Sequence, residues 1–217
     1  MSASTSTRPV PDLPVAGVIP FSATDWPGLL TATVFTQGCP LSCRYCHNPT
    51  LQAFRGGEVS FPGVLEFLDT RRGLLDGLVI SGGEPTVHRG LGAAVAATRA
   101  RGFPVGLHTS GYSPTRLAAL LAEPTTRPDW IGLDVKGLPA STPGVVGCTP
   151  ATARRMWESL DVVTAAGVEV QVRTTVWPGS LLERQLPELR ARVRDAGHEL
   201  VVQYARGVDA DGHHRVA

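Results

Sequence analysis

Short apolar runs alternate with longer segments of helical periodicity along most of the chain, from residue 31 onward. The apolar runs have the length and composition of buried strands in a parallel sheet. They predict strands over residues 31–36, 77–81, 104–109, 130–135, 169–175 and 199–204. The segments between them predict helices over residues 62–71, 91–101, 114–121, 151–166 and 182–196.

Several of these helices carry start or stop signals. Ser113-Pro114 and Thr149-Pro150 each place proline at a first helical position, where its missing N–H has no helical partner to lose. Three glycines stand between a predicted helix and the next strand, as C-terminal capping glycines do: Gly102, Gly167 and Gly197. Local chemistry therefore marks the same boundaries as the periodicity.

Strands that alternate with helices predict one parallel sheet with right-handed crossovers. Six strands are fewer than the eight of a closed barrel, so the pattern leaves an open, partial barrel and a doubly wound sheet as alternatives. In both folds, functional residues gather at the C-terminal ends of the strands. Motifs directly after strands are therefore the first candidates for chemistry.

Composition and charge narrow the class of protein. The chain has 217 residues, which is enough for one domain with a full core, and 20 cationic against 19 anionic side chains give a net charge of +1. This near-equality of cationic and anionic side chains argues against a nucleic-acid partner, because nucleic-acid-binding proteins carry an excess of positive charge. The sequence contains neither an apolar run of membrane-spanning length nor the apolar core of a signal peptide, so we expect a cytoplasmic protein. We expect a disordered leader over residues 1–16, one domain over 17–206 and a polar tail over 207–217.

Three of the four cysteines lie within eight residues, in Cys39-Pro-Leu-Ser-Cys43-Arg-Tyr-Cys46-His47, directly after the first predicted strand. In a cytoplasmic protein such clustering indicates metal chemistry and not a disulfide. Three thiolates suit a [4Fe–4S] cluster, which usually takes four, with one iron left open for a substrate or cofactor. A Cys3His zinc site that includes His47 is the alternative, although structural zinc sites usually draw their ligands from two separated pairs.

A second motif, Ser81-Gly82-Gly83-Glu84-Pro85, follows the second predicted strand. Its two glycines permit close backbone approach to a ligand, and its proline can open the next helix. Taken alone, an ordinary turn between a strand and a helix would look the same. Because this motif follows the next strand after the cysteine loop, the two motifs together indicate a shared site much more specifically than either motif does alone.

A third motif, Asp134-Val135-Lys136, ends the fourth predicted strand. Residues two apart on a strand point to the same face, so the carboxylate and the ammonium project together at the functional end. A surface ion pair would contribute only ~0–1 kcal/mol. However, Lys136 is the only lysine among the 20 cationic residues, which suggests that this position requires a compact ammonium and not a guanidinium.

Together these motifs resemble the radical S-adenosylmethionine (SAM) superfamily, and within it the glycyl-radical-enzyme activases of anaerobic ribonucleoside-triphosphate reductase. The similarity also includes the segments 17–28, 35–39, 45–49, 80–86 and 172–176. It therefore covers most of the chain. It implies an α/β fold, the partial (β/α)6 barrel of radical SAM enzymes.

The resemblance also implies two cofactors, a [4Fe–4S] cluster and SAM. Cys39, Cys43 and Cys46 would ligate the cluster. No catalytic side chain is implied beyond the cofactors, because they carry the radical chemistry. The implied SAM contacts are Tyr45, Cys46, His47, Gly82, Gly83, Glu84, Ser110, Asp134, Lys136 and Arg173.

Some residues carry weaker expectations. Arg173 is expected either near the adenosyl group or paired with Glu84 or Asp134. Related activases have an acidic residue where this chain has His108, so a cation or amine contact is not expected there. Cys148 is expected to be a lone thiol. The remaining histidines are expected to be surface or solvated side chains: His88, His198, His213 and His214.

The implied partner is a glycyl-radical enzyme, with anaerobic ribonucleotide reductase as the first choice, and the implied electron donor is a flavodoxin- or ferredoxin-type protein. Neither nucleic acid nor a membrane is expected as a partner. Three alternatives remain open. The first is a radical SAM enzyme that acts on a small molecule, such as a 7-carboxy-7-deazaguanine synthase. The others are a pyruvate formate-lyase activating enzyme and, outside enzymes, a zinc-stabilised binding module.

Overall fold

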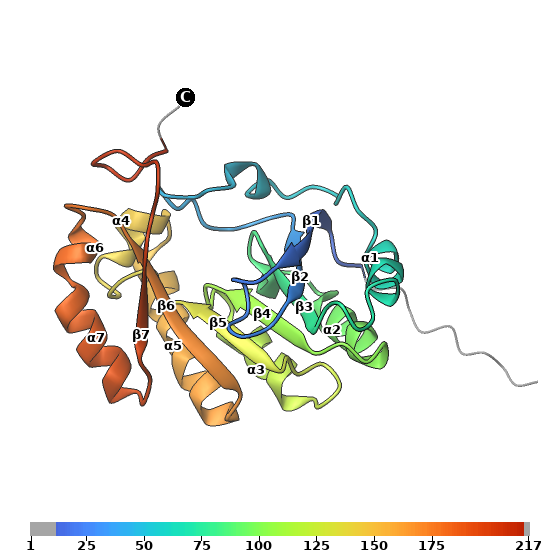
Figure 1. The fold of residues 1–217 in the computed structure, drawn as a ribbon. Coiled ribbons are helices and arrows are strands. Elements are labelled where there is room, and N and C mark those ends of the chain that lie inside the picture. The colour runs from blue at the N-terminus through green and yellow to red at the C-terminus, as the bar shows by residue number, and fades with distance from the viewer. Residues whose placement is uncertain (1–11, 215–217) are drawn as a thin grey trace, which may run out of the picture.

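The structure, a computed structural model, describes residues 12–214. Its centre is one curved sheet of seven strands whose spatial order equals their order in the sequence (Figure 1). Six strands run parallel, and the first strand pairs antiparallel with the second. The strands are β1 (Val15–Ser22), β2 (Thr31–Thr36), β3 (Gly77–Gly82), β4 (Val105–Thr109), β5 (Trp130–Asp134), β6 (Glu169–Val176) and β7 (Leu200–Tyr204).

The helices form the crossovers between the parallel strands and cover the outer face of the sheet (Figure 1). They are α1 (Phe61–Asp69), α2 (Leu91–Ala100), α3 (Pro114–Ala122), α4 (Thr142–Val146), α5 (Pro150–Ala166), α6 (Leu181–Arg184) and α7 (Leu186–Asp195), with 3-10 turns η1 (Pro49–Leu51) and η2 (Pro85–Val87). A doubly wound sheet reverses its strand order at a switch point. This sheet does not, so the architecture is the partial barrel, open between β1 and β7.

Three elements differ from those predicted from the sequence. Strand β1 was missed because its central residues are exposed and because Gly17 and Pro20 weaken a strand pattern. The five-residue helix α4 was also missed. The single helix predicted over 182–196 is two helices, α6 and α7, which meet at Gln185.

The domain extends beyond the limits predicted for it. Leu13 and Val15 are buried and β1 begins inside the predicted leader, so the leader was predicted to end too late; its residues 1–11 lie outside the described residues. At the other end, Val208 and His214 form a β-bridge, so the described part of the predicted tail is folded. Within residues 12–214, no helix has the length and apolarity needed to cross a membrane.

Three clusters of apolar side chains stabilise the described part of the barrel. The largest lies between the sheet and the helices and includes Leu78, Leu107 and Ile131. A second packs around Met156 and Trp177. The smallest closes the base of the barrel, where Trp26 stacks on Trp130 at 5.6 Å between ring centroids. The cavity described below therefore has a packed base.

Candidate functional site

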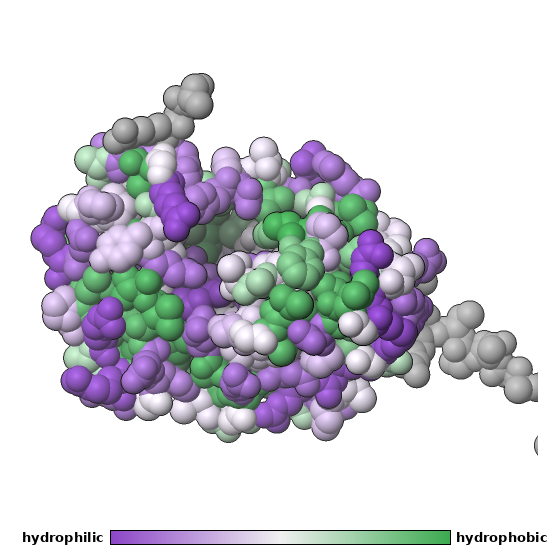
Figure 2. Space-filling model, viewed as in Figure 1, coloured by the Kyte–Doolittle hydropathy of each residue, from purple (hydrophilic) through white to green (hydrophobic). Residues whose placement is uncertain are grey.

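A cavity of about 670 Å³ lies at the C-terminal ends of the parallel strands. Figure 2 shows the surface hollowed here, between β1 on one side and β7 on the other. The wall is formed by the loop after β2 and by residues from the ends of β3 to β7. Every SAM contact or cluster ligand expected from the sequence lines this cavity, with the exception of Arg173.

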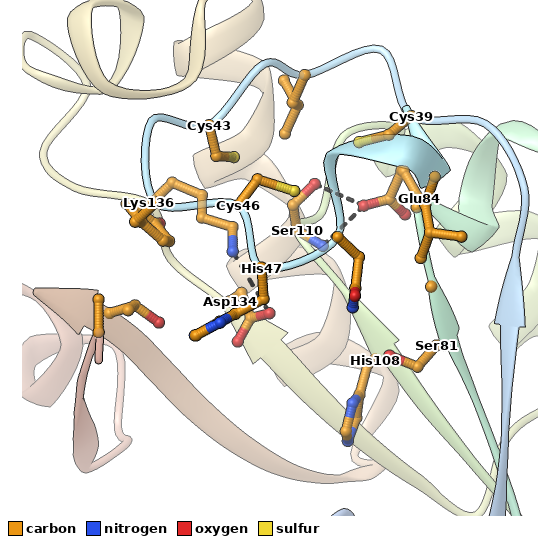
Figure 3. Close-up of a pocket in the computed structure, with 18 of the residues that line it drawn as sticks. Cys39, Cys43, Cys46, His47, Ser81, Glu84, His108, Ser110, Asp134 and Lys136 are labelled. Atoms are coloured by element: carbon orange, nitrogen blue, oxygen red, sulfur yellow. Dashed lines mark hydrogen bonds and ion pairs between the residues drawn. The ribbon is translucent and has the colours of Figure 1, made fainter. Parts of the chain in front are cut away.

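The cysteine loop is held from both sides by backbone hydrogen bonds. At its start, Gly38 N donates to Leu51 O at 2.8 Å, so the segment after the loop closes over its beginning. At its centre, Ser42 N donates to Val146 O at 2.9 Å, which fastens the loop to the end of α4. The fixed loop directs the sulfur atoms of its three cysteines toward one space (Figure 3).

The three cysteines fit a cluster better than a zinc ion. None of them forms a disulfide. Burial raises the pKa of the Cys39 thiol to about 12, and burial also raises the pKa of Cys43, so these thiols lose their protons only when a metal binds them. Within residues 12–214, no three metal-ligating side chains converge on a single-ion position. A cluster separates its thiolate ligands, because each binds a different iron.

The two glycines of the second motif pack against the cysteine loop. A Cβ on Gly82 would lie 2.0 Å from the backbone nitrogen of Thr36, and one on Gly83 would lie 2.2 Å from the carbonyl oxygen of Gly38. Backbone hydrogen bonds join the same segments, from Gly83 N to Thr36 O at 2.8 Å and from Glu84 N to Gly38 O at 3.0 Å. The close contact between the two motifs therefore requires glycine at both positions. The sequence had suggested only that these glycines let the backbone approach a ligand.

Glu84 is buried, with 1% of its surface exposed. One carboxylate oxygen accepts hydrogen bonds from Thr86 N and Oγ1 and from Thr109 Oγ1. The other accepts from Ser110 N at 2.8 Å and from Ser110 Oγ at 2.5 Å (Figure 3). No cation of the described chain lies within ion-pair distance of this carboxylate. It therefore joins the turn after β3 to the turn after β4.

Asp134 lies between two cations. Arg173 Nε donates to its Oδ1 at 2.9 Å, and the ammonium of Lys136 lies 3.5 Å from its Oδ2. Burial opposes ionisation of Asp134, but Arg173 and then Lys136 outweigh it and hold the carboxyl pKa well below its usual range. Burial likewise opposes the charge of Lys136, and Asp134 keeps the lysine pKa above its ordinary value. Both groups are charged at neutral pH.

Arg173 pairs with Asp134, which is one of the two arrangements expected from the sequence. Its guanidinium lies where a Cβ on Gly132 would clash at 2.8 Å, so a glycine on β5 makes room for it. It also approaches His108 Nε2 at 3.1 Å. Burial, followed by Arg173, lowers the pKa of His108 to about 4. The ring is therefore neutral, with its Nε2 2.7 Å from the carbonyl oxygen of Asp25.

Tyr45 lies deeper than its neighbours in the cysteine loop. Its ring packs on Trp177, at 5.6 Å between centroids, and the ammonium of Lys136 lies 5.7 Å from its centroid. Its hydroxyl is buried and has no hydrogen-bond partner among residues 12–214. Since a buried hydroxyl without a partner is costly, Tyr45 fits a site in which a ligand supplies the missing bond.

The C-terminal segment forms a wall that the sequence did not predict. Trp177 Nε1 donates to Ala210 O at 3.0 Å, and the turn is closed by Asp209 Oδ1, which accepts from two backbone amides. This places the ring of His214 4.5 Å from that of His47. The prediction that His214 is solvated was therefore wrong. His214 itself does not line the cavity, whereas four residues that the sequence did not single out do: Thr175, Gln203, Tyr204 and Arg206.

The remaining singled-out residues lie outside the cavity. Cys148 packs beside the apolar cluster around Met156 and does not line the cavity. His198 Nε2 lies 2.7 Å from Thr164 Oγ1 at the surface. His88 is half-buried, which differs from the expected surface position.

Comparisons with known proteins agree with this architecture. A family model described as the radical SAM superfamily matches residues 33–185. A solved structure of SuiB from Streptococcus suis bound to S-adenosylmethionine superposes with a TM-score of 0.61 at 15% identity, over 83% of this chain and 41% of that chain. This chain thus spans less than half of the length of that relative, and the likeness concerns the fold.

Three curated relatives are similar in sequence. A protein of Methanocaldococcus jannaschii assigned as a glycyl-radical enzyme activating enzyme is 26% identical over 88% of this chain and 79% of its own length. A protein of Haemophilus influenzae with the same assignment is 35% identical over 46% of this chain and 39% of its own. The 7-carboxy-7-deazaguanine synthase of Aquifex aeolicus is 32% identical over 39% of this chain and 37% of its own.

Proposed function

This chain belongs to the radical SAM superfamily, and we propose that it is an activase that generates a glycyl radical on a partner enzyme. The partner we propose is anaerobic ribonucleoside-triphosphate reductase. The observation that carries the activase assignment is the similarity to the archaeal activating-enzyme relative, which extends over 88% of this chain and 79% of that protein. The match to the deazaguanine synthase extends over a much smaller share of both chains.

The shape of the site supports a macromolecular substrate. The barrel is open between its edge strands β1 and β7, and the cavity reaches the surface at this opening (Figure 2). Ile19 and Phe21 on β1 are exposed, at 43% and 57%. Exposed apolar side chains beside a polar cavity are typical of a surface that receives another protein.

The residues around the cavity divide the work of holding the two cofactors. Cys39, Cys43 and Cys46 would ligate the [4Fe–4S] cluster, and when bound the reduced cluster and SAM together supply the 5′-deoxyadenosyl radical that abstracts hydrogen. The charged ammonium of Lys136 suits the carboxylate of SAM, and Asp134 suits a hydroxyl of its ribose. The backbone at Gly82 and Gly83 borders the same cavity, beside the cysteine loop.

Electron supply and water exclusion complete the proposal. We propose a flavodoxin- or ferredoxin-type protein as the electron donor. The packed base formed by Trp26 and Trp130 closes the barrel from below, and the C-terminal segment forms part of the wall from above. The cavity is then open to solvent only on the side where we propose that the partner docks, and a docked partner would cover that side and protect the radical from water.

The decisive experiment combines the anaerobically reconstituted protein with SAM, a one-electron reductant and the reductase. A doublet electron paramagnetic resonance signal should form on the reductase, because a glycyl radical couples to its one remaining α-hydrogen. The doublet should collapse toward a singlet when the reductase carries α-deuterated glycine. Consumption of a small purine-like substrate with SAM, and no signal on the reductase, would instead support the deazaguanine synthase alternative. A signal on pyruvate formate-lyase alone would reassign the partner.

A further inference from the structure

We infer that Glu84 is a positioning residue that fastens together the turns after β3 and β4, and that its carboxylate does not contact SAM. The inference depends on SAM binding, which follows from the family, and not on which partner receives the radical. It concerns the one acidic side chain of the second motif, for which the sequence alone suggested contact with the cofactor.

The first argument is the number of donors around the carboxylate. An ionised carboxylate offers about four acceptor positions on its two oxygens. Five N–H and O–H groups already donate to those of Glu84, at 2.5 to 3.0 Å. The side chain is also 1% exposed. It has no acceptor position left for the ammonium group of a ligand.

The second argument is where these donors come from. Thr86 lies in the turn after β3, whereas Thr109 ends β4 and Ser110 follows it, 25 and 26 residues after Glu84 in the chain. The backbone N–H of Glu84 donates to Gly38 O, at the start of the cysteine loop. One residue therefore connects three segments of the cavity wall.

The third argument is that the second turn is itself fixed to the barrel. Gly111 N donates to Thr109 Oγ1 at 3.0 Å, and Gly111 O accepts from Ser159 Oγ on α5 at 2.7 Å. A Cβ on Gly111 would lie 2.7 Å from Ser159. The turn after β4 is thus fixed to the long helix α5. Glu84 links this turn to the segment that contains Gly82 and Gly83, so that segment is held in place as well.

Thr86 provides the decisive variant, because it donates to Glu84 Oε1 at 2.6 Å but does not line the cavity. Thr86→Val removes this hydroxyl at nearly constant volume. Glu84→Gln replaces one acceptor oxygen with an amide that cannot accept from threonine or serine. Thr98→Val is the matched control, since Thr98 is equally buried and donates only within α2, to Ala94 O.

Two measurements test the inference on these variants. Hydrogen exchange of the cofactor-free protein should rise in peptides covering 81–86 and 108–112 for both Thr86→Val and Glu84→Gln, but not for Thr98→Val. Equilibrium binding of SAM to the reconstituted protein should weaken about tenfold for Glu84→Gln and less for Thr86→Val. Combining the two should weaken binding no further than Glu84→Gln alone, because both act through one network.

Three results would overturn the inference. Weaker SAM binding in Glu84→Gln, with exchange unchanged and Thr86→Val binding like the parent, would make the carboxylate a direct ligand. Faster exchange with unchanged SAM affinity would make the network purely structural. Additive losses in the double variant would separate the two residues. If the Glu84→Gln protein does not take up the cluster, the hydrogen exchange and the SAM affinity of Thr86→Val alone test the inference.

Discussion

Arg173 on β6 and Asp134 on β5 stand directly opposite one another in the parallel register, and their side chains form a partly buried ion pair at 2.9 Å. Lys136 completes the group from the other side of the carboxylate. Two cations against one anion leave a net positive charge at this wall of the cavity. That charge is available for an anionic group of the ligand, because Arg173 balances the charge of Asp134 and leaves the charge of Lys136 uncompensated.

Replacement of Arg173 should therefore destabilise the protein in a pH-dependent manner. Arg173→Ala leaves the partly buried carboxylate with Lys136 as its remaining partner and removes a charge-assisted hydrogen bond, which costs about 1.5–3 kcal/mol of unfolding free energy at pH 7. The pKa of Asp134 is depressed in the folded state, so its stabilising effect is present above the unfolded value of about 3.9 and is lost as the pH falls toward the folded value. The difference between parent and variant should shrink from pH 7 to pH 3.

Denaturant titrations at several pH values measure this difference. Arg184→Ala is a suitable control, because Arg184 lies on the short helix α6 and its Nη1 bonds only the backbone of Gly179. A constant difference across the whole pH range would show that Arg173 acts by packing alone.

We expect the three cysteines of the loop to be essential for cluster binding and Cys148 to be dispensable for it. Cys39→Ala, Cys43→Ala and Cys46→Ala should each lower the iron content after anaerobic reconstitution and abolish reductive SAM cleavage, because three thiolates are the minimum that holds the cluster. Cys148→Ala should keep both properties, since Cys148 lies outside the cavity. Iron and sulfide analysis with absorbance near 400 nm measures the first property, and product analysis measures the second. A fully active Cys43→Ala protein would contradict the ligand assignment.

Much of this fold and site could be predicted from the sequence because the signals are local. The six parallel strands read as apolar runs because the side chains under the helices on the outer face of the sheet are apolar, and the three motifs follow strands directly. The partners of Glu84 were not predictable, because nothing near Thr109 marks its contact with a residue 25 positions away. The same holds for His214, whose Nε2 lies 3.3 Å from a carbonyl oxygen 169 positions earlier. Strand β1 is largely apolar, but Gly17 and Pro20 interrupt its strand pattern.

Loss of the only lysine should weaken SAM binding without affecting the cluster. Lys136→Ala removes a charge-assisted hydrogen bond worth about 1.5–3 kcal/mol, which is roughly tenfold to over a hundredfold in affinity. Its raised pKa keeps the ammonium charged through neutral and mildly alkaline pH, so the affinity of the parent should not fall between pH 7 and pH 9 through loss of this charge. Equilibrium binding and iron content measure the two properties. Equal SAM affinity in parent and variant would assign Lys136 to the ion pair with Asp134 alone.

The contact between the glycine motif and the cysteine loop gives the last prediction. A methyl group on Gly83 would meet the Gly38 carbonyl at 2.2 Å, and neither backbone segment can move without breaking the hydrogen bonds that join them. Gly83→Ala should therefore lower the unfolding temperature by several degrees and reduce cluster incorporation, although residue 83 is not a cluster ligand. Gly144→Ala is the matched control, because Gly144 lies within α4 with open space around it, and alanine there should be neutral or stabilising. Thermal unfolding and iron content of both variants measure these effects, and normal cluster incorporation in Gly83→Ala would show that the two motifs are assembled independently.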